Sequence, residues 1–424
     1  MEQFNQKRRR ILAGGGVATA LSVLGQIPAQ AQTREVRIGY VSPQTGPLAA
    51  FGEADKWVIA GLQAKLKAGI IIAGKLVQVR LIVNDSQSSP TRAGEVANDL
   101  MLKDEVDLIL VSSTPETANP VSDACELNEV PCISTVVPWQ PWFFGRGGKP
   151  ASGFGWTYHM FWGLEDVIAN YTSGWKSLQT SKRVGGLFPN DGDGNAGGDK
   201  ERGFAKPLAA GGFTLTDPGR YQNMNQDFSA QIAAFKRANV DIVTGVMIPP
   251  DAKTFLTQAR QQGFRPRVIT LGKALLFPAA IEALGDLGEG LTTEVWWSPW
   301  HPFKSSLLGM DAKGLCALYE EQTKKQWTQP IGFSHALFEV AFDTLRRAKS
   351  TDRSAIRDAL AATNMNTIVG PVKWGGQGPF KNVSKTPLVL GQWVKGKKYK
   401  YELAIVDSTA NPAIPTNGKL KLIA

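Results

Sequence analysis

The feature that most constrains the fold of this chain is a repeated alternation of short β-branched runs with longer amphipathic segments. Runs such as 36–41 and 106–111 have the length and residue types of buried strands, and the segments between them have helical periodicity. Parallel strands need helical crossovers, so the alternation predicts parallel sheets covered by helices. It stops near residue 135 and resumes near residue 184, which predicts two such units.

The places where this alternation breaks are rich in aromatic residues, proline and glycine, namely 136–162 and 296–300. Such changes in composition are typical of passages between domains, so we predict that the chain crosses between its two units there. Seven of the twelve tryptophans fall in these segments, which favours an aromatic-lined cleft, although packing of the joint between the units explains them too. They are Trp139, Trp142, Trp156, Trp162, Trp296, Trp297 and Trp300.

The N-terminal segment has the pattern of an export signal. Arg8-Arg9-Arg10 is followed by a short run of small and apolar residues and then by Ala29-Gln30-Ala31, a small-x-small cleavage site. We therefore predict that residues 1–31 are a signal peptide and that the mature protein begins at Gln32 in a bacterial periplasm. The paired arginines indicate the twin-arginine route, and the ordinary secretory route stays open because the residues before them depart from that pattern.

The net charge of +10 does not single out a nucleic-acid surface. Part of it belongs to the N-terminal segment, and the densest later cluster is Lys395, Lys397, Lys398 and Lys400. These lysines flank the turn of a hairpin predicted from 388–394 and 399–406, where lysines commonly protect an exposed sheet edge. We expect no nucleic-acid partner. No later segment approaches about 18 consecutive apolar residues, so we expect the exported protein to be free in solution.

The three cysteines do not form a C-x-x-C motif. Cys125 and Cys132 bracket the end of a predicted helix and the start of a predicted strand, so we predict a disulfide between them in an oxidising compartment, with two free thiols as the alternative. Cys316 lies in an amphipathic stretch and is interpreted as a small buried hydrophobe.

A glycine-rich stretch, 192–197, reads G-x-G-x-x-G between a predicted strand and a predicted helix, and Asp217 follows at the distance of a ribose-binding acid. Three residues separate the strand from the first glycine, so an open loop that uses glycine for positive φ is the favoured interpretation. The same stretch resembles the start of a calcium loop, but Ala196 and Arg202 stand where glycine and glutamate are required. We expect no metal site.

Catalytic motifs are absent from the sequence. The run Gly332-Phe333-Ser334-His335-Ala336 departs from a nucleophile elbow at its last position, and Ser334 is interpreted as a helix cap. The three histidines lack metal-ligand spacing. We therefore predict no catalytic residues.

Polar loops at the carboxyl ends of predicted strands are the better candidates, because open α/β sheets bind ligands there. The loop 112–117 offers hydroxyl groups and a helix N-terminus to an anion, or alternatively these groups only cap the helix. A second loop carries Lys273, either as a partner for an anion or as a solvated lysine.

Several stretches are similar to a known family. They are IGYVSPQTGPLAAFG at 38–52, the serine loop at Ser112, PVSD at 120–123, VPCIS at 130–134, DFSAQI at 227–232 and QARQQG at 258–263. In these the mature chain resembles the periplasmic substrate-binding proteins of the leucine/isoleucine/valine-binding type, which serve ATP-driven importers.

The resemblance implies an α/β fold of two Rossmann-like, doubly wound lobes joined by a three-segment hinge, that is, a type I periplasmic binding protein. The expected lobes are 32–158 with 296–382 and 159–295 with 383–424.

The resemblance also implies a ligand site. In this family the loops matching Ser112-Ser113 and Thr135-Val136 hold a ligand carboxylate, and an aromatic residue matching Phe51 packs on the ligand's body. An acidic residue of the second lobe receives the ligand's ammonium, but Lys273 stands at that position here. A lysine cannot accept a hydrogen bond from an ammonium, so we expect a small carboxylate rather than an ordinary branched-chain amino acid. We expect Trp139, Trp156 and Trp297 to complete the site, for an aromatic or bulky apolar acid.

The expected function is therefore that of a monomeric periplasmic binding protein that delivers a small carboxylate to an ABC permease in the inner membrane, without cofactor or enzymatic activity. Two alternatives stay open, an exported dinucleotide-dependent oxidoreductase and a ligand-binding sensor module.

Overall fold

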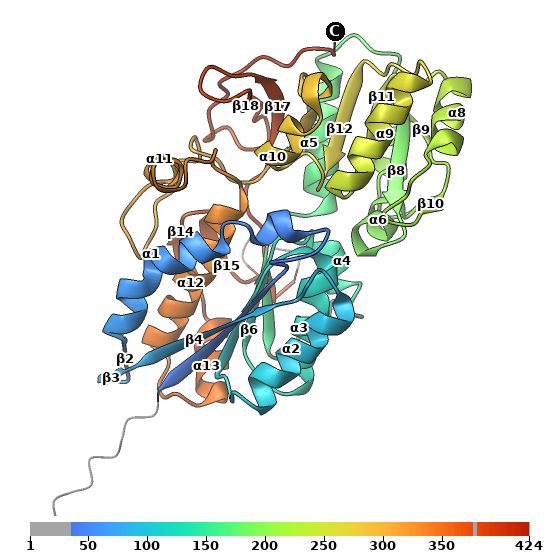
Figure 1. Cartoon of the computed structure of the whole chain (residues 1–424). Coiled ribbons are helices and arrows are strands. Elements are labelled where there is room, and N and C mark those ends of the chain that lie inside the picture. The colour runs from blue at the N-terminus through green and yellow to red at the C-terminus, as the bar shows by residue number, and fades with distance from the viewer. Residues whose placement is uncertain (1–34, 376–379, 424) are drawn as a thin grey trace, which may run out of the picture. The chain divides into compact units, whose positions relative to one another are not determined.

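A computed structural model describes residues 35–375 and 380–423, which form two α/β lobes, each built on its own sheet (Figure 1). The predicted signal peptide lies outside the described residues. The six strands of the first sheet are all parallel, in the order β16-β7-β6-β5-β1-β4. They are β1 (Val36–Ser42), β4 (Val79–Asp85), β5 (Leu108–Val111), β6 (Cys132–Thr135), β7 (Thr157–Met160) and β16 (Val383–Ser384).

Helices cover both faces of this sheet. The side chains of β1 alternate, so that Ile38 and Tyr40 join one buried cluster with α1 and α12, while Val41 joins another with α2 and α3. This arrangement is doubly wound, as predicted, because both faces of a parallel sheet must be covered. The helices are α1 (Asp55–Ala68), α2 (Pro90–Leu102), α3 (Thr114–Leu127), α12 (Pro330–Arg347) and α13 (Arg353–Ala361).

The second sheet has the order β10-β8-β11-β12-β13-β17-β18, with β9 beside β8. Its first strands are parallel, and β17 and β18 add an antiparallel hairpin at one edge. The strands are β8 (Arg183–Pro189), β9 (Thr214–Thr216), β10 (Arg220–Tyr221), β11 (Ile242–Val246), β12 (Val268–Gly272), β13 (Thr292–Val295), β17 (Val389–Lys395) and β18 (Tyr401–Asp407). The helices of this lobe include α5 (Leu164–Lys176), α6 (Gly192–Gly197), α7 (Ala205–Ala210), α8 (Ser229–Arg237), α9 (Pro249–Gln261) and α10 (Pro278–Glu282).

The chain passes between the two sheets three times: after β7, after β13 and after β16. The first sheet extends two residues beyond the boundaries expected at 158 and 382, because Val383 and Ser384 of β16 pair with His159 and Met160 of β7.

The predicted hairpin and its lysines are present at the edge of the second sheet. Its strands are β17 and β18, and Lys395 lies 2.9 Å from Glu289 while Lys398 lies 2.7 Å from Glu320. Both lysines therefore have an acidic partner, and the expected role at an exposed edge fits β18, which ends the sheet.

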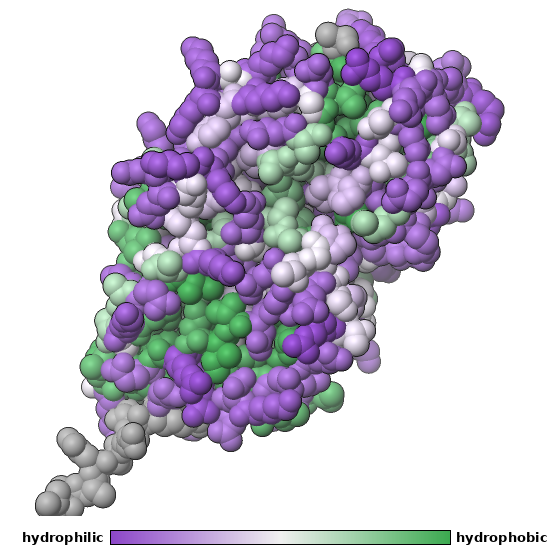
Figure 2. Space-filling model, in the orientation of Figure 1, coloured by the Kyte–Doolittle hydropathy of each residue, from purple (hydrophilic) through white to green (hydrophobic). Residues whose placement is uncertain are grey.

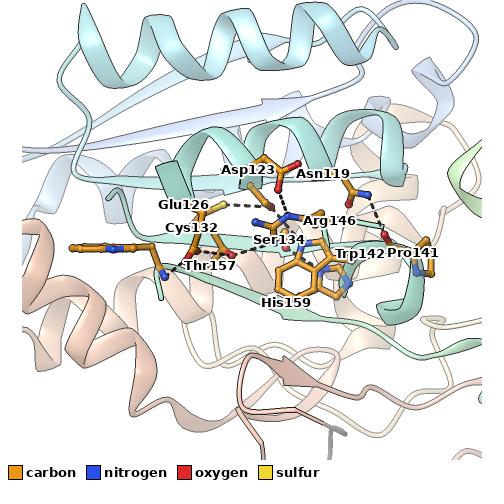
Figure 3. A network of polar contacts seen from close by, with 12 residues as sticks. Asn119, Asp123, Glu126, Cys132, Ser134, Pro141, Trp142, Arg146, Thr157 and His159 are labelled. Atoms are coloured by element: carbon orange, nitrogen blue, oxygen red, sulfur yellow. Dashed lines mark hydrogen bonds and ion pairs between the residues drawn. The ribbon is translucent and has the colours of Figure 1, made fainter. Parts of the chain in front are cut away.

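The aromatic segment after β6 packs mainly into the first lobe. In α4 (Trp139–Phe143), Trp142 is fully buried, and its ring stacks on His159 with a centroid distance of 4.7 Å. Figure 3 shows Arg146 beside this pair, where it reaches Asp123 of α3 at 2.6 Å and Thr157 of β7 at 3.1 Å. For this part of the segment, packing explains the aromatic residues.

Cys125 and Cys132 are buried free thiols in this structure, and so is Cys316. Burial, followed by a hydrogen bond with Cys132, raises the pKa of Cys125 well above its ordinary value. The two thiols are therefore neighbours, and a bridge between them in the exported protein stays a prediction.

The surface drawn in Figure 2 is mostly hydrophilic, with an apolar area over the first lobe in the region of α1 and β4. Among the described helices, none is long and apolar enough to cross a membrane.

The strand β16, which precedes the third crossing, is held to the first lobe by its pairing with β7 and by the buried side chain of Asn382 before it. Its amide group donates to the carbonyl oxygens of Phe154 at 3.0 Å and Thr157 at 2.9 Å, and its oxygen accepts from the Phe154 N–H at 2.8 Å. Asn382 is fully buried, so its amide group depends on these backbone partners.

We predict that Asn382→Ala lowers the free energy of unfolding by about 2 to 4 kcal/mol, since it removes three hydrogen bonds and leaves buried polar groups unpaired. Chemical denaturation of the mature protein measures this change. Lys381→Ala, at the exposed neighbouring position, is the control and should change the value by less than about 0.5 kcal/mol. Equal effects of the two substitutions would contradict the role given to Asn382.

Candidate functional site

A cavity lies between the lobes, where strands of both sheets end. Thr114 and Val136 follow β5 and β6 of the first sheet, while Gly272 ends β12 of the second and Lys273 comes next. Most of the cavity wall is apolar, and the lining includes Phe51, Phe161, Trp162, Val167, Leu276 and Trp296.

Three of the residues predicted for the site line this cavity: Phe51, Val136 and Lys273. Phe51 packs edge to face on Phe277, with a centroid distance of 4.8 Å. Phe51 therefore belongs to the cavity wall, and its contact with a ligand stays a prediction.

The other predicted residues are not in the lining. Ser112 and Ser113 precede Thr114 and are buried, and Thr135 uses its hydroxyl to bond the Met160 carbonyl oxygen at 2.7 Å. Trp297 is fully buried and donates to the Ile368 carbonyl oxygen at 3.2 Å.

The two remaining tryptophans also have structural partners. Trp139 donates to Glu165 at 3.0 Å, and Trp156 lies under the Arg357 guanidinium at 4.6 Å from its ring centre. The first aromatic segment nevertheless supplies Trp162, and the second supplies Trp296.

Three lining residues have a left-handed backbone although none is glycine. The φ angles are 63° at Thr114, 59° at Val136 and 65° at Lys273. Such conformations cost about 1 to 3 kcal/mol each and persist only where the surrounding structure imposes them. Their location at one cavity indicates that loop geometry there is set by the site.

At the first-lobe end, polar groups lack partners. The Thr114 hydroxyl and the Trp162 indole N–H are buried and have no hydrogen-bond partner within the described part of the chain, and the same holds for the Ser113 hydroxyl beside them. Buried polar groups are nearly always paired, so these donors make this end of the cavity a candidate position for a polar group of a ligand. The sequence marked this loop by its run of hydroxyl residues.

At the second-lobe end, Lys273 is surrounded by acids. Its ammonium lies 3.0 Å from Asp193, 3.4 Å from Glu116 and 3.6 Å from Asp191. Its side chain is 5% exposed, so the interpretation as a solvated lysine is wrong. Burial opposes the charged form, but Glu116, Asp193 and Asp191 together raise the pKa of Lys273 well above its ordinary value. The ammonium is therefore already matched by carboxylates of the protein.

The pKa values of the two acids of the α6 region are shifted in opposite directions. Burial raises the pKa of Asp193 to about 7, with the negative charges of Glu116 and Asp191 acting in the same direction against Lys273. Burial also opposes ionisation of Asp191, but Lys273, Asn223 and the Gly194 N–H hold its pKa below the ordinary value.

Glu294 of β13 is a site residue that the sequence reasoning missed. Its carboxylate lines the cavity and accepts from the Lys273 N–H at 3.1 Å, from the Thr293 hydroxyl at 3.0 Å and from the Tyr171 hydroxyl. Burial raises the pKa of Glu294, and these hydrogen bonds favour the ionised form. A single acid inside an otherwise uncharged strand was the available signal.

The glycine-rich stretch forms the short helix α6, capped by Asp191, and the expected positive φ is not found at its glycines. Close packing explains Gly194, because a Cβ atom there would lie 2.1 Å from the Pro189 carbonyl oxygen. Asp217 pairs with Arg220 at 3.3 Å. The acids Asp191 and Asp193 make this helix a poor partner for pyrophosphate.

The fold and the interlobe cavity define a two-lobed binding protein. The chain belongs to the periplasmic binding protein family, whose match covers residues 35–398.

Solved structures agree with this fold. A leucine-binding protein from Thermotoga maritima is 21% identical, with a TM-score of 0.71 over 89% of this chain and 99% of that one. An ABC transporter solute-binding protein from R. palustris in complex with 4-hydroxybenzoate is 15% identical, with a TM-score of 0.71 over 88% and 96%. A branched-chain amino acid transporter substrate-binding protein from Streptococcus pneumoniae in complex with isoleucine is 14% identical, with a TM-score of 0.67 over 88% and 99%.

We predict that Tyr171→Phe lowers the free energy of unfolding by about 1.5 to 3 kcal/mol at pH 8, because it removes a donor to a buried carboxylate. That hydrogen bond lowers the pKa of Glu294, so it stabilises the ionised form, and the loss should be smaller at pH 5. Denaturation at the two pH values measures the difference, with Tyr158→Phe as the control for a change of tyrosine elsewhere. A loss independent of pH would contradict the role of Tyr171.

Proposed function

We propose that this protein is the periplasmic solute-binding component of an ABC importer and that it captures a small carboxylate with a bulky apolar or aromatic body. The observation that carries the proposal is the interlobe cavity, whose walls are largely apolar and whose first-lobe end holds buried donors without partners among the described residues.

The donors at Thr114 and Trp162, which line the cavity, suit a carboxylate, since an ionised carboxylate only accepts hydrogen bonds. Charge-assisted hydrogen bonds of this kind are roughly twice as strong as neutral ones. The loops named by the family resemblance lie at this same end. Two of the similar solved proteins are described as complexes with isoleucine and with 4-hydroxybenzoate, both of which carry a carboxylate.

Lys273 is not the group to which we assign that carboxylate. Three acids already surround its ammonium, so an additional anion would meet net negative charge at the second-lobe end. The carboxylate is therefore assigned to the first-lobe donors, and the body of the ligand to the aromatic wall.

In this proposal, burial of the ligand's apolar surface against the cavity wall contributes most of the binding free energy. Phe51 approaches from the first lobe and Trp296 from the end of the second unit, so a flat or branched body is held between them. Burying apolar surface contributes about 25 cal/mol per Å², which favours a bulky acid over a small one such as acetate.

A solute-binding component of an importer needs a membrane partner. We assign delivery to a membrane permease driven by an ATPase and expect the protein to act as a monomer. Closure of the lobes on the three-segment hinge retains the ligand.

A thermal-shift screen of the mature protein across amino acids, aromatic acids, amides and ureas tests the class of ligand. The proposal expects stabilisation by acids with bulky bodies and little by their amides. Stabilisation by amides or ureas alone would overturn the carboxylate assignment.

For an acid found in that screen, we predict that Thr114→Val weakens binding by about 10- to 100-fold, the value of one charge-assisted hydrogen bond. Valine keeps the branched shape and removes only the hydroxyl. Thr257→Val, on the exposed side of α9, is the matched control and should leave affinity unchanged. Titration calorimetry measures both, and an unchanged affinity in Thr114→Val would place the carboxylate elsewhere.

We also propose export by the twin-arginine route. Replacement of Arg8, Arg9 and Arg10 by lysine keeps the charge of the segment, so it should abolish export by that route and leave the ordinary secretory route intact. Cell fractionation measures how much protein is exported, and mass spectrometry identifies its N-terminal residue. A variant exported and cleaved after Ala31 at the normal level would exclude the twin-arginine route.

A further inference from the structure

The ion pairs of Lys273 connect the two lobes. Lys273 follows β12 and Asp191 and Asp193 belong to the α6 region, all in the second lobe, whereas Glu116 belongs to α3 in the first. The backbones also meet here, since a Cβ atom at Gly192 of α6 would lie 2.7 Å from the Cβ of Pro115. Separation of the lobes would remove Glu116 from Lys273 and leave the other two acids in place.

The charges at this contact do not balance. One ammonium faces three carboxylates, and the side chains of all four residues are between 5% and 16% exposed. Two carboxylate oxygens, Glu116 Oε1 and Asp193 Oδ1, are buried without a partner in the described part of the chain. Each carboxylate that approaches disfavours the ionised form of the others.

Other titratable groups that face the contact lie on four further elements and add no compensating positive charge. Glu294 on β13 accepts from the Lys273 N–H, Tyr171 on α5 donates to Glu294, and Asp251 on α9 and Tyr221 on β10 lie beside Asp191. The balance of charge is therefore decided by Lys273 and by protonation of an acid.

We propose that Lys273 is a positioning residue that clamps the lobes together through Glu116, and that formation of this clamp takes up one proton at Asp193. The inference deepens the proposed function and rests on it, because closure is the step that retains the ligand.

Asp193 is the group that takes the proton because it is the acid for which ionisation is least favoured. Its pKa is raised to about 7 here, mainly by burial and then by Glu116 and Asp191, whereas the pKa of Asp191 is lowered. Opening the lobes removes Glu116 and admits water, and both changes lower the pKa of Asp193.

The direction of the pH dependence follows. The closed arrangement binds more protons than the open one between the two pKa values of Asp193, so low pH favours closure. Between pH 5.5 and pH 8 the ratio of closed to open molecules should fall by about 30-fold, since Asp193 of the closed form loses its proton near pH 7 and one proton changes an equilibrium by at most tenfold per pH unit.

Small-angle X-ray scattering of the mature protein without ligand, at pH 5.5 and pH 8, tests the clamp. The expected result is a smaller radius of gyration at pH 5.5. Glu116→Gln should abolish most of this pH response, and Asp193→Asn should stay compact at both values. Glu129→Gln, an exposed acid just beyond α3, removes the same charge and should respond like the unmodified protein. An unmodified protein with the same radius at both pH values overturns the proposal.

Two substitutions at Lys273 identify its role. Lys273→Met should open the lobes at both pH values, and Lys273→Arg should restore compactness and the pH response because it keeps the charge. Circular dichroism verifies that each variant is folded, and a folded Lys273→Met that stays compact at pH 5.5 overturns the clamp. Because scattering needs no ligand, failure of the ligand screen and failure of the clamp are separate results.

Discussion

Parallel strands that end at a common edge are the constraint on which the rest of this structure depends. A parallel sheet directs every strand in the same sense, so the loops after its carboxyl ends gather on one side. Thr114 and Val136 come from two such loops of the first sheet, and Lys273 comes from one of the second. Two sheets that face each other with these edges produce a cavity with polar groups at both ends and aromatic residues along the wall.

The two ends of the cavity differ in chemistry. Thr114 and Trp162 carry donors that have no partner among the described residues, whereas the carboxylates at the other end already have Lys273. A buried cation with three acidic neighbours is costly to form unless all the groups are positioned together. Two of these acids belong to the same lobe as Lys273, and Glu116 belongs to the other, so the electrostatics of this end depend on how the lobes meet.

Most of the tryptophans in the two aromatic segments pack within the protein instead of lining the cavity. Trp142 stacks on His159, Trp297 bonds the backbone at Ile368, and Trp139 bonds Glu165, so each indole N–H or ring has a structural partner. Of the seven tryptophans in the two aromatic segments, Trp162 and Trp296 reach the cavity, where Phe161 accompanies them. Their clustering in the sequence marked the joint between the lobes correctly, but it did not distinguish wall from cavity.

The sequence by itself determined the alternation of strands and helices, the two doubly wound lobes, the places where the chain crosses between them and the loops that carry Phe51, Val136 and Lys273. These follow from periodicity and from residue types within short windows. Only the tertiary structure decided what surrounds those residues. Glu116 and Lys273 are 157 positions apart, and the carboxylate of Glu294 belongs to a different strand from the loop that it contacts. The sequence shows which side chains are ionisable, but distant segments provide the burial and the neighbours that set each pKa. For this reason the sequence left open a solvated Lys273, whereas in the structure its ammonium is buried and paired with carboxylates.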